Sequence, residues 1–231
     1  MTAIILAGGL GTRLQSIVND VPKPMADING KPFLEYIFYY LLKYNITDVI
    51  LSVGYKQEII KNYFKNKYKT INILYSSEDI PLGTGGAIKH AMKLVNNTNS
   101  VLIINGDTFF DINLINLYKE KDNNNFDIII ALKELSCFDR YGSVIVKNNI
   151  IEKFQKKKFT KKGYINGGIY ILNKNIFNNY KTLDSFSFED FLENNLSKIK
   201  AYAYISNNSY FIDIGIPEDY KQAKIDFKEK F

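Results

Sequence analysis

The chain has 231 residues, of which 46% are hydrophobic and 23% are charged, a composition typical of a globular protein with a substantial core. No apolar run approaches the roughly 20 residues that span a bilayer, and no basic segment precedes the short apolar run at the N-terminus, so we expect neither a membrane partner nor a signal peptide. The single cysteine excludes an intrachain disulfide, and these features together favour a cytoplasmic protein.

The formal charge of +6 raises the question of a nucleic-acid partner. Most of the lysines are scattered among asparagines, and no arginine-rich arm or nucleic-acid-binding module is recognisable. The densest basic patch consists of Lys153, Lys156, Lys157, Lys158, Lys161 and Lys162. We expect a solvated face, or a field that attracts anionic small molecules, and no nucleic acid.

A glycine-rich stretch follows the first predicted strand, residues 3–6, and residues 6–25 read LAGGLGTRLQSIVNDVPKPM. Glycines at the end of a first strand allow a tight turn and offer bare N–H groups to phosphates. Arg13 can bind two phosphate oxygens at once, and two prolines hold Lys23 on a stiff segment. The stretch matches neither the P-loop nor the G-x-G-x-x-G fingerprint, so it predicts a phosphate site of another kind.

The next elements alternate between helices and strands. Helices are predicted at 33–44 and 56–64, and strands at 49–53 and 71–75. This order predicts parallel strands with a ligand at their C-terminal ends. The expected fold class is α/β, with a Rossmann-like, mixed and mostly parallel sheet flanked by helices in a single domain.

A second glycine-rich loop, LGTGGA at 82–87, leads into a helix that extends to Leu94 and directs its N-terminus at a ligand. Ahead of this loop, the Glu78 carboxylate can accept both donors of the guanine edge, N1–H and the N2 amino group, although a solvated loop acid is the alternative. Asp107 follows the fourth strand, 101–104, where it can hold the Mg²⁺ of a nucleotide. As the sole histidine, His90 is expected to be structural.

The second half is richer in strands. We expect Asp111 to cap a helix at 112–121 and Ser187 to cap another at 187–196. Strands are predicted at 127–132, 144–146, 165–172, 201–205 and 210–212, with short ones around 150 and 154 and a closing helix from 218. No linker or repeat is visible. Residues 1–231 are therefore expected to form one domain, with a nucleotide-binding half to about 125 and a sugar-binding half from about 126.

The motifs GGLGTRL and PKPM resemble the N-terminal signature of the sugar-1-phosphate nucleotidyltransferases, and the resemblance extends over essentially the whole chain. Members of this family join an NTP to a sugar 1-phosphate and release pyrophosphate. The resemblance implies a catalytic set of Arg13, Lys23, Asp107 and Asp213, with the two aspartates as Mg²⁺ ligands. It implies nucleotide-binding residues Leu6, Ala7, Gly8, Gly9, Gly11, Thr12, Glu78, Gly83, Thr84 and Gly85. The substrate-binding residues that it implies are Asn105, Tyr141, Gly142, Lys157, Asn166 and Gly167.

Two positions depart from the family pattern. When Ile151 and Phe154 are matched to its apolar positions, Lys156 stands where a glutamate is usual and Lys157 becomes the phosphate-contacting lysine. The other alignment uses the literal Glu152-Lys153 pair, but it misplaces Phe154. Ile216 replaces a threonine that would cap the last helix ahead of Pro217, and its loss is expected to be tolerated.

Within the family, the motifs LAGGLGTRL, DVPKPM, GKPFLEY, SVGY and PLGTGGA are most similar to D-glycero-D-manno-heptose 1-phosphate guanylyltransferases. This implies GTP and D-glycero-α-D-manno-heptose 1-phosphate as substrates, and GDP-heptose for bacterial surface polysaccharides as the product. The alternatives are mannose, glucose or N-acetylmuramic acid 1-phosphate with UTP or CTP, a molybdopterin guanylylation, or a catalytically silent sugar-nucleotide sensor. A homodimer is left open.

Overall fold

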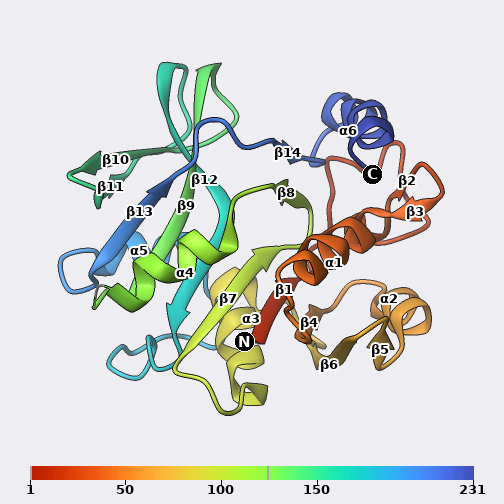
Figure 1. The fold of residues 1–231 in the computed structure, drawn as a ribbon, viewed down its shortest axis with the longest axis horizontal. Coiled ribbons are helices and arrows are strands. Elements are labelled where there is room, and N and C mark those ends of the chain that lie inside the picture. The colour runs from red at the N-terminus through yellow and green to blue at the C-terminus, as the bar shows by residue number, and fades with distance from the viewer. Residues whose placement is uncertain (1, 124) are drawn as a thin grey trace.

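The computed structural model describes residues 2–123 and 125–231, and ten strands within these residues form one mixed sheet across the molecule (Figure 1). In spatial order the strands are β10 (Ser143–Lys147), β11 (Ile150–Phe154), β13 (Ala201–Ile205), β9 (Ile128–Phe138), β12 (Thr160–Asn173), β7 (Ser100–Asn105), β1 (Thr2–Leu6), β4 (Asp48–Val53), β6 (Ile71–Ser77) and β5 (Lys67–Tyr68).

The first half of the chain builds the parallel part of this sheet. Strands β7, β1, β4 and β6 are neighbours and run parallel. Helices α1 (Phe33–Lys43), α2 (Gln57–Phe64) and α3 (Gly83–Ala91) connect them, and α3 continues as the 3-10 helix η2 (Met92–Leu94). The predicted βαβαβ order is therefore confirmed. The continuous apolar runs of β1 and β7 suit strands that are buried on both faces.

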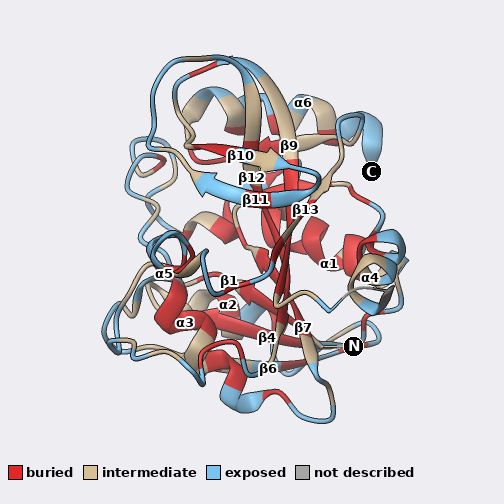
Figure 2. Ribbon diagram, turned by 90° about the vertical axis from the view of Figure 1, so that its left-hand side faces the viewer, coloured by how far each residue is buried: buried red, intermediate tan, exposed pale blue. Residues whose placement is uncertain are grey.

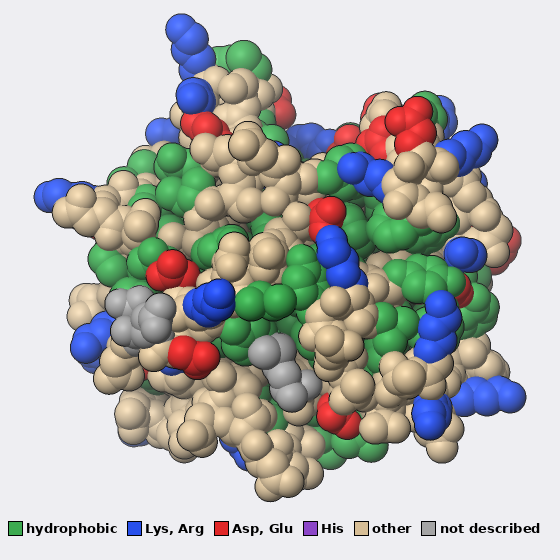
Figure 3. All heavy atoms as spheres, viewed as in Figure 1, with side chains coloured by type: hydrophobic (Ala, Val, Ile, Leu, Met, Phe, Trp, Pro, Cys, Tyr) green, Lys and Arg blue, Asp and Glu red, His purple; other side chains and the backbone are tan. Residues whose placement is uncertain are grey.

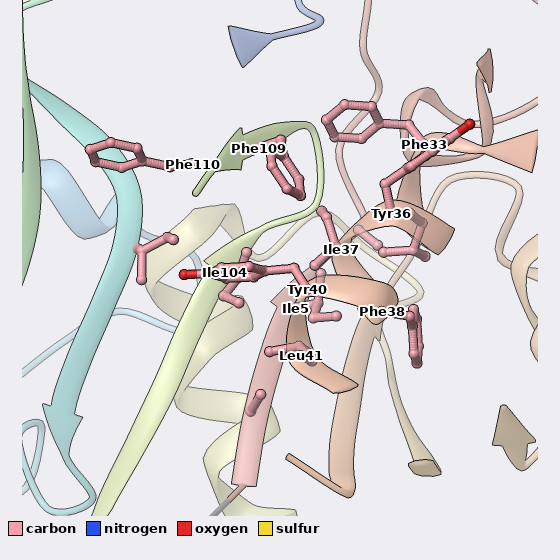
Figure 4. Close-up of a cluster of buried hydrophobic side chains, with 14 of the residues drawn as sticks. Ile5, Phe33, Tyr36, Ile37, Phe38, Tyr40, Leu41, Ile104, Phe109 and Phe110 are labelled. Carbon is pink, nitrogen blue, oxygen red and sulfur yellow. The ribbon is translucent and has the colours of Figure 1, made fainter. Parts of the chain in front are cut away.

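Hydrophobic side chains cover both faces of the sheet. Successive strand residues point to opposite faces, so Ile5 packs into one buried cluster and Ile4 into the other. Helices α1, α2, α4 (Leu114–Asn123) and α6 (Pro217–Lys230) contribute to the first cluster, and α3 and α5 (Phe188–Asn195) to the second. Figure 4 shows the first cluster, in which Phe33 and Ile37 lie with Ile5 and Ile104, and Figure 2 shows that the central strands are buried.

The second half extends the sheet mainly with antiparallel pairs. β12 pairs with β7 on one side and with β9 on the other, so both halves of the chain share a single sheet. β12 begins at Thr160, earlier than predicted, because pairing with β9 extends over polar residues that carry no strand pattern of their own. The α/β fold class with a mixed sheet is confirmed, but the expectation of a mostly parallel sheet is wrong. Besides the parallel strands of the first half, β13 pairs in parallel with β9, and the other described pairings of this sheet are antiparallel.

Of the two helix caps predicted from the sequence, one is confirmed and the other is wrong. Ser187 accepts a hydrogen bond from the Asp190 N–H at 3.2 Å and caps α5 as predicted. The prediction that Asp111 caps α4 is wrong, because Asn113 accepts the Asn116 N–H at 3.1 Å. Asp111 instead pairs with Lys43 at 3.5 Å. Ile112 is fully buried, and α4 begins two residues later than predicted, at Leu114.

Two small sheets complete the fold: β2 (Asp27–Ile28) with β3 (Lys31–Pro32), and β8 (Thr108–Phe110) with β14 (Phe211–Asp213). None of the helices in the described part of the chain is both long and apolar enough to cross a membrane. On the face shown in Figure 3, lysine and arginine side chains are spread around the surface and do not form one continuous patch.

Candidate active site

The glycine-rich loop after β1 is shaped by two close approaches. Gly11 has a φ of +61°, and a Cβ added there would lie 2.9 Å from the Cβ of Lys23. A Cβ on Gly8 would lie 2.3 Å from Oε1 of Glu78. Larger side chains at either position would therefore clash with a residue that the site needs. Among the described residues, no protein acceptor takes the backbone N–H groups of residues 8–13, so they can bind an anion.

Three charged side chains meet near this loop. Lys23 Nζ lies 2.6 Å from Asp107 Oδ2 and 3.3 Å from Asp213 Oδ1. The side chains of Lys23 and Asp213 are 9% and 14% exposed, whereas that of Asp107 is 36% exposed. Lys23 begins the 3-10 helix η1 (Lys23–Met25), with Pro22 in extended conformation before it.

The pairing of β8 with β14 brings the two aspartates together. Thr108 is the register partner of Asp213, and the Ile214 N–H donates to the Asp107 carbonyl at 3.1 Å. The Thr108 hydroxyl donates to Asp107 Oδ1 at 3.1 Å, and the Gly215 N–H donates to Asp213 Oδ1 at 2.7 Å. Residues more than a hundred positions apart thus form one rigid pair of carboxylates.

The carboxylate pair fits a hard divalent cation. Both carboxylates already converge on one cation, the Lys23 ammonium, and oxygen donors are those that Mg²⁺ prefers. No cluster of three or more His, Cys, Asp or Glu side chains that could hold a metal occurs in the described residues. The remaining ligands would therefore come from water or from substrate phosphates, as is common for Mg²⁺.

Arg140 lies next to Asp213, and the sequence did not predict a role for this arginine. Its Nη1 lies 2.6 Å from Asp219 Oδ2 on α6, and its Nη2 donates to the Tyr141 hydroxyl at 2.9 Å and lies 4.0 Å from Asp213 Oδ2. Burial alone lowers the pKa of Arg140, but the hydrogen bond to Asp219 and the nearby Tyr141 and Asp213 raise it on balance. Burial, and next the Asp213 charge, raise the pKa of Tyr141, so its phenol stays protonated.

A cavity of about 860 Å³ opens beside these charges, at the C-terminal ends of the parallel strands. Many predicted residues line it: Leu6, Gly8, Gly9, Gly11, Thr12, Arg13, Lys23, Glu78, Gly83, Thr84, Asn105 and Asp107. Sequence reasoning assigned no role to Ser52, Gly54, Tyr55 and Gln57, which also line it. The SVGY motif at the end of β4 contains Ser52, Gly54 and Tyr55 and could have pointed to them, whereas Gln57 lies outside it. Ala7 is buried beneath the loop, and its N–H donates to the Ser52 carbonyl at 2.8 Å.

Glu78 is partly buried and lines this cavity, so it is not a solvated loop acid. Its Oε2 accepts the Leu82 N–H at 2.9 Å. A Cβ added to Gly54 would lie 3.0 Å from Oε1, which also lies close to Gly8. The carboxylate therefore sits over two strand-end glycines, with Oε1 taking none of the hydrogen bonds described for the chain.

The LGTGGA segment forms the first turns of α3, and the segment before α5 covers it. The Phe186 carbonyl accepts the N–H groups of Gly85 and Gly86 at 2.9 and 3.3 Å. A Cβ on Gly85 would lie 2.2 Å from the Phe186 ring. Two amides of this helix N-terminus are thus already paired, whereas no acceptor outside the helix is described for those of Gly83 and Thr84, so the expectation that it points at a ligand stays a prediction. Gly83 and Thr84 still line the cavity, whereas Gly85 is buried under Phe186.

The predicted sugar-side residues are spread around a bulge in β12. The register between β12 and β9 shifts between Asn166 and Tyr170, and Gly168 has a φ of +74°. Asn166 Nδ2 donates to the Tyr170 hydroxyl at 2.7 Å. Gly167 is buried, and a Cβ there would lie 2.4 Å from the Phe110 ring, so this glycine serves packing.

Tyr141, Gly142 and Lys157 line neither the 860 Å³ cavity nor its neighbour. A Cβ on Gly142 would lie 2.5 Å from the Gln155 carbonyl, and the Gln155 N–H donates to Ser143 at 2.7 Å. Lys157 is exposed two residues beyond this contact. His90 lies apart from the carboxylate pair, with Nδ1 3.0 Å from the Ser76 hydroxyl, in line with the structural role predicted for it.

A second cavity, of about 460 Å³, shares the walls formed by Leu6, Gly83, Thr84 and Asn105 with the first. Its other lining residues come from β12 and from the start of α5: Tyr170, Ser185, Phe186, Ser187, Phe188 and Glu189. No sequence pattern pointed to residues 185–189, because they reach the site only through tertiary contacts such as the 2.9 Å hydrogen bond from the Phe188 N–H to Thr84 Oγ1.

The chain resembles known proteins over nearly its full length. It is 55% identical over 221 residues to the D-glycero-alpha-D-manno-heptose 1-phosphate guanylyltransferase of Campylobacter jejuni, with 95% of this chain and 97% of that protein covered. It is 51% identical over 225 residues to the protein of the same name in Aneurinibacillus thermoaerophilus, with 97% of each covered.

A solved structure is also similar. The crystal structure of HddC from Yersinia pseudotuberculosis complexed with GMP-PN matches with a TM-score of 0.84 and 39% identity, covering 98% of this chain and 99% of that one. A family model described as nucleotidyl transferase matches residues 2–230. With a glycine loop, a lysine between two carboxylates and this match along the whole fold, the chain belongs to the nucleotidyl transferase family.

Proposed function

We propose that this enzyme transfers the guanylyl group of GTP to D-glycero-α-D-manno-heptose 1-phosphate, giving GDP-heptose and pyrophosphate. The observation that carries the proposal is the convergence of Lys23, Asp107 and Asp213 beside a cavity whose glycine loop has free N–H groups. The relatives that share more than half of their residues with this chain carry the name of that reaction, which supports the choice of substrates.

The chemistry needs positioning and charge neutralisation more than proton transfer. The sugar 1-phosphate already carries an anionic oxygen nucleophile, so its in-line attack on the α-phosphate of GTP needs no general base. Lys23 lies where it can neutralise charge that develops between the reacting phosphates. Arg13 and the free amides of residues 8–13 would hold the departing pyrophosphate.

Asp107 and Asp213 would hold Mg²⁺, which when bound relieves repulsion between the two reacting phosphates. In that state the Lys23 ammonium would give up its place between the carboxylates and turn toward a phosphate oxygen. The single cysteine and the nucleotide substrate suit a cytoplasmic reaction. The product would be the activated heptose for capsule or lipopolysaccharide, and a homodimer would be compatible with this role.

Base choice is assigned to Glu78. Guanine presents two adjacent donors, N1–H and the N2 amino group, to which an ionised carboxylate offers only acceptors. The position of Glu78 at the cavity wall, over Gly8 and Gly54, supports this contact. Uracil or thymine would turn carbonyl oxygens toward the same carboxylate, and buried acceptors facing each other are unfavourable.

The test is a substrate screen. Purified enzyme with Mg²⁺ would be mixed with GTP, UTP, dTTP or CTP and with heptose, mannose, glucose or N-acetylmuramic acid 1-phosphate, and pyrophosphate release would be followed. The proposal predicts the highest kcat/KM for GTP with heptose 1-phosphate. A higher value for another pair would reassign the substrates, and no turnover of any pair would favour a silent sensor or another nucleotidyl acceptor.

A further inference from the structure

The second cavity differs from the first in its charge. Glu189 is the one charged side chain among its described lining residues, whereas the first cavity has the cations Arg13 and Lys23 besides the carboxylates Glu78, Asp79 and Asp107, so only the first offers cations to a phosphate. A carboxylate repels phosphate but accepts hydrogen bonds from neutral hydroxyl groups. The phosphates of both substrates therefore belong in the first cavity, and a neutral, hydroxyl-bearing part of a ligand suits the second.

The shared wall fixes which part of the sugar reaches the second cavity. Asn105 lines both cavities and lies two residues before Asp107, so the two backbones are at most about 7 Å apart. A sugar 1-phosphate whose phosphate lies at Asp107 and Lys23 can place its ring over Asn105, on the wall that the two cavities share. The end of the ring that is farthest from the phosphate then points past Thr84 toward α5.

Asn166, which lies beside the second cavity, connects two polar residues of its lining, Tyr170 and Glu189. Asn166 Nδ2 donates to the Tyr170 hydroxyl at 2.7 Å and lies 3.4 Å from Glu189 Oε1. Burial, and next the Glu189 charge, raise the pKa of Tyr170, so its hydroxyl stays protonated and can donate. The Glu189 side chain is exposed and its described hydrogen bond from Asn166 is long, at 3.4 Å, so its carboxylate can also accept hydrogen bonds from a ligand.

We propose that the second cavity is the subsite for the exocyclic C6–C7 diol of the heptose, and that the Glu189 carboxylate accepts hydrogen bonds from its two hydroxyl groups. This inference rests on the proposed function and extends it to the residue that distinguishes a heptose from a hexose. Mannose 1-phosphate has the same ring configuration but a single exocyclic hydroxyl, so it can make only part of this contact. Glu189 is therefore a specificity-determining residue.

The experiment measures selectivity. The ratio of kcat/KM for heptose 1-phosphate to that for mannose 1-phosphate, each with saturating GTP, would be compared in wild type and Glu189→Gln. Because hydrogen bonds to a charged acceptor are about twice as strong as neutral ones, the ratio should fall about tenfold. Glu193→Gln removes an exposed carboxylate from the same helix outside both cavities, and its ratio should equal that of wild type.

A second variant tests whether the heptose needs the volume of the second cavity, independently of the Glu189 charge. Ser185→Leu places a larger side chain at the wall of the second cavity, and it should lower kcat/KM for heptose 1-phosphate more than for mannose 1-phosphate. Unchanged ratios in both variants would overturn the subsite while leaving the heptose reaction in place. A wild-type enzyme that does not use heptose 1-phosphate would instead contradict the proposed function, and the subsite with it.

Discussion

Lys23 joins the two carboxylates that we propose as Mg²⁺ ligands. In this structure its ammonium lies between two carboxylates, at 2.6 and 3.3 Å, and its side chain is only 9% exposed. Two negative groups held so close together need a cation between them. The Lys23 ammonium is that cation here, and it holds Asp107 and Asp213 together at the proposed metal site. A side chain able to neutralise either the carboxylates or a phosphate suits a site that fills with charged ligands.

The base-reading role of Glu78 can be tested by one substitution. In Glu78→Gln, one acceptor oxygen becomes a donor that faces the donors of guanine, so kcat/KM for GTP should fall at least tenfold relative to that for UTP. Steady-state kinetics with GTP, UTP, dTTP and CTP measure this preference. A GTP preference that survives the substitution, or a wild-type preference for a pyrimidine, would show that Glu78 does not choose the base.

Which of Lys157 and Lys153 contacts the sugar phosphate remains a prediction, and the burial of nearby residues favours Lys157. Ile151 is buried and Phe154 packs against the core, as the alignment with Lys157 requires. Lys157 lines neither cavity in this structure, so the alignment predicts that it reaches the sugar phosphate only in the bound enzyme, and Lys157→Ala should then raise KM for the sugar 1-phosphate strongly with little effect on KM for GTP. Lys153→Ala should behave as a surface change, and the opposite ranking of the two variants would favour the alignment with Glu152-Lys153.

Arg140 acts through Asp213 as a positioning residue. Partners of metal ligands commonly contribute 10–100-fold to metal affinity or activity, so Arg140→Ala should lower kcat about tenfold and raise the Mg²⁺ concentration that gives half-maximal rate. Titrating Mg²⁺ in the assay measures both effects. Lys221→Ala, an exposed change on α6, serves as the control. A normal Mg²⁺ dependence in the Arg140 variant would limit this residue to a structural role.

At the scale of secondary structure, local patterns predicted the elements but not their partners. Apolar runs indicated β1, β4, β6 and β7, and Ser187 was recognised as a cap because its partner is three residues away. The pairing of β8 with β14, the cover of Phe186 over α3 and the second cavity all join segments about a hundred residues apart. Such contacts leave no periodic signal, so the site was predicted where motifs were local and missed where tertiary packing builds it.

A buried carboxylate links α1 to α2, and its energetics depend on pH. Tyr63 and Tyr39 donate to Glu35 at 2.6 and 2.8 Å. Burial raises the pKa of Glu35, but hydrogen bonds from Tyr63, Tyr39 and Tyr68 outweigh it and lower the pKa below 4.5. The resulting stabilisation is present above pH 4.5 and is lost as the pH falls through the lowered pKa.

The pKa of Tyr63 sets the upper pH limit of the range in which its hydrogen bond to Glu35 stabilises the fold. Burial, and next the Glu35 contact, raise its pKa from 10.0 to about 12. The stabilisation is present below pH 10 and is lost as the pH rises toward 12. Tyr63→Phe should cost about 1 kcal/mol at neutral pH, a low value because this tyrosine is 48% exposed, and should lower Tm by about 2–4 °C.

Thermal unfolding of wild type and Tyr63→Phe across this pH range measures the effect. The difference in Tm should narrow as the pH rises from 10 toward 12. Tyr44→Phe, which removes a 3.1 Å hydrogen bond to the neutral Ile112 carbonyl, is the matched control. A difference in Tm that stays constant to high pH would show that Tyr63 does not stabilise the fold through the Glu35 charge.

At the scale of the whole molecule, one sheet carries both substrates. The parallel strands of the first half end at the glycine loop and Glu78, while β12 and α5 of the second half reach the same cavity system through Tyr170 and Glu189. The pairing of β7 with β12 fixes the two halves relative to each other. Rigid positioning of this kind is what an in-line transfer between two bound anions requires.

The most direct test of this account is the rate of pyrophosphate formation from GTP and D-glycero-α-D-manno-heptose 1-phosphate with Mg²⁺, in wild type and in Asp107→Asn and Asp213→Asn. Losing a metal carboxylate removes several kcal/mol of transition-state stabilisation, so each variant should be about a thousandfold slower or worse while its circular dichroism spectrum remains that of wild type. A folded variant with near-wild-type kcat, or a wild-type enzyme that releases no pyrophosphate from this pair, would contradict the central claim.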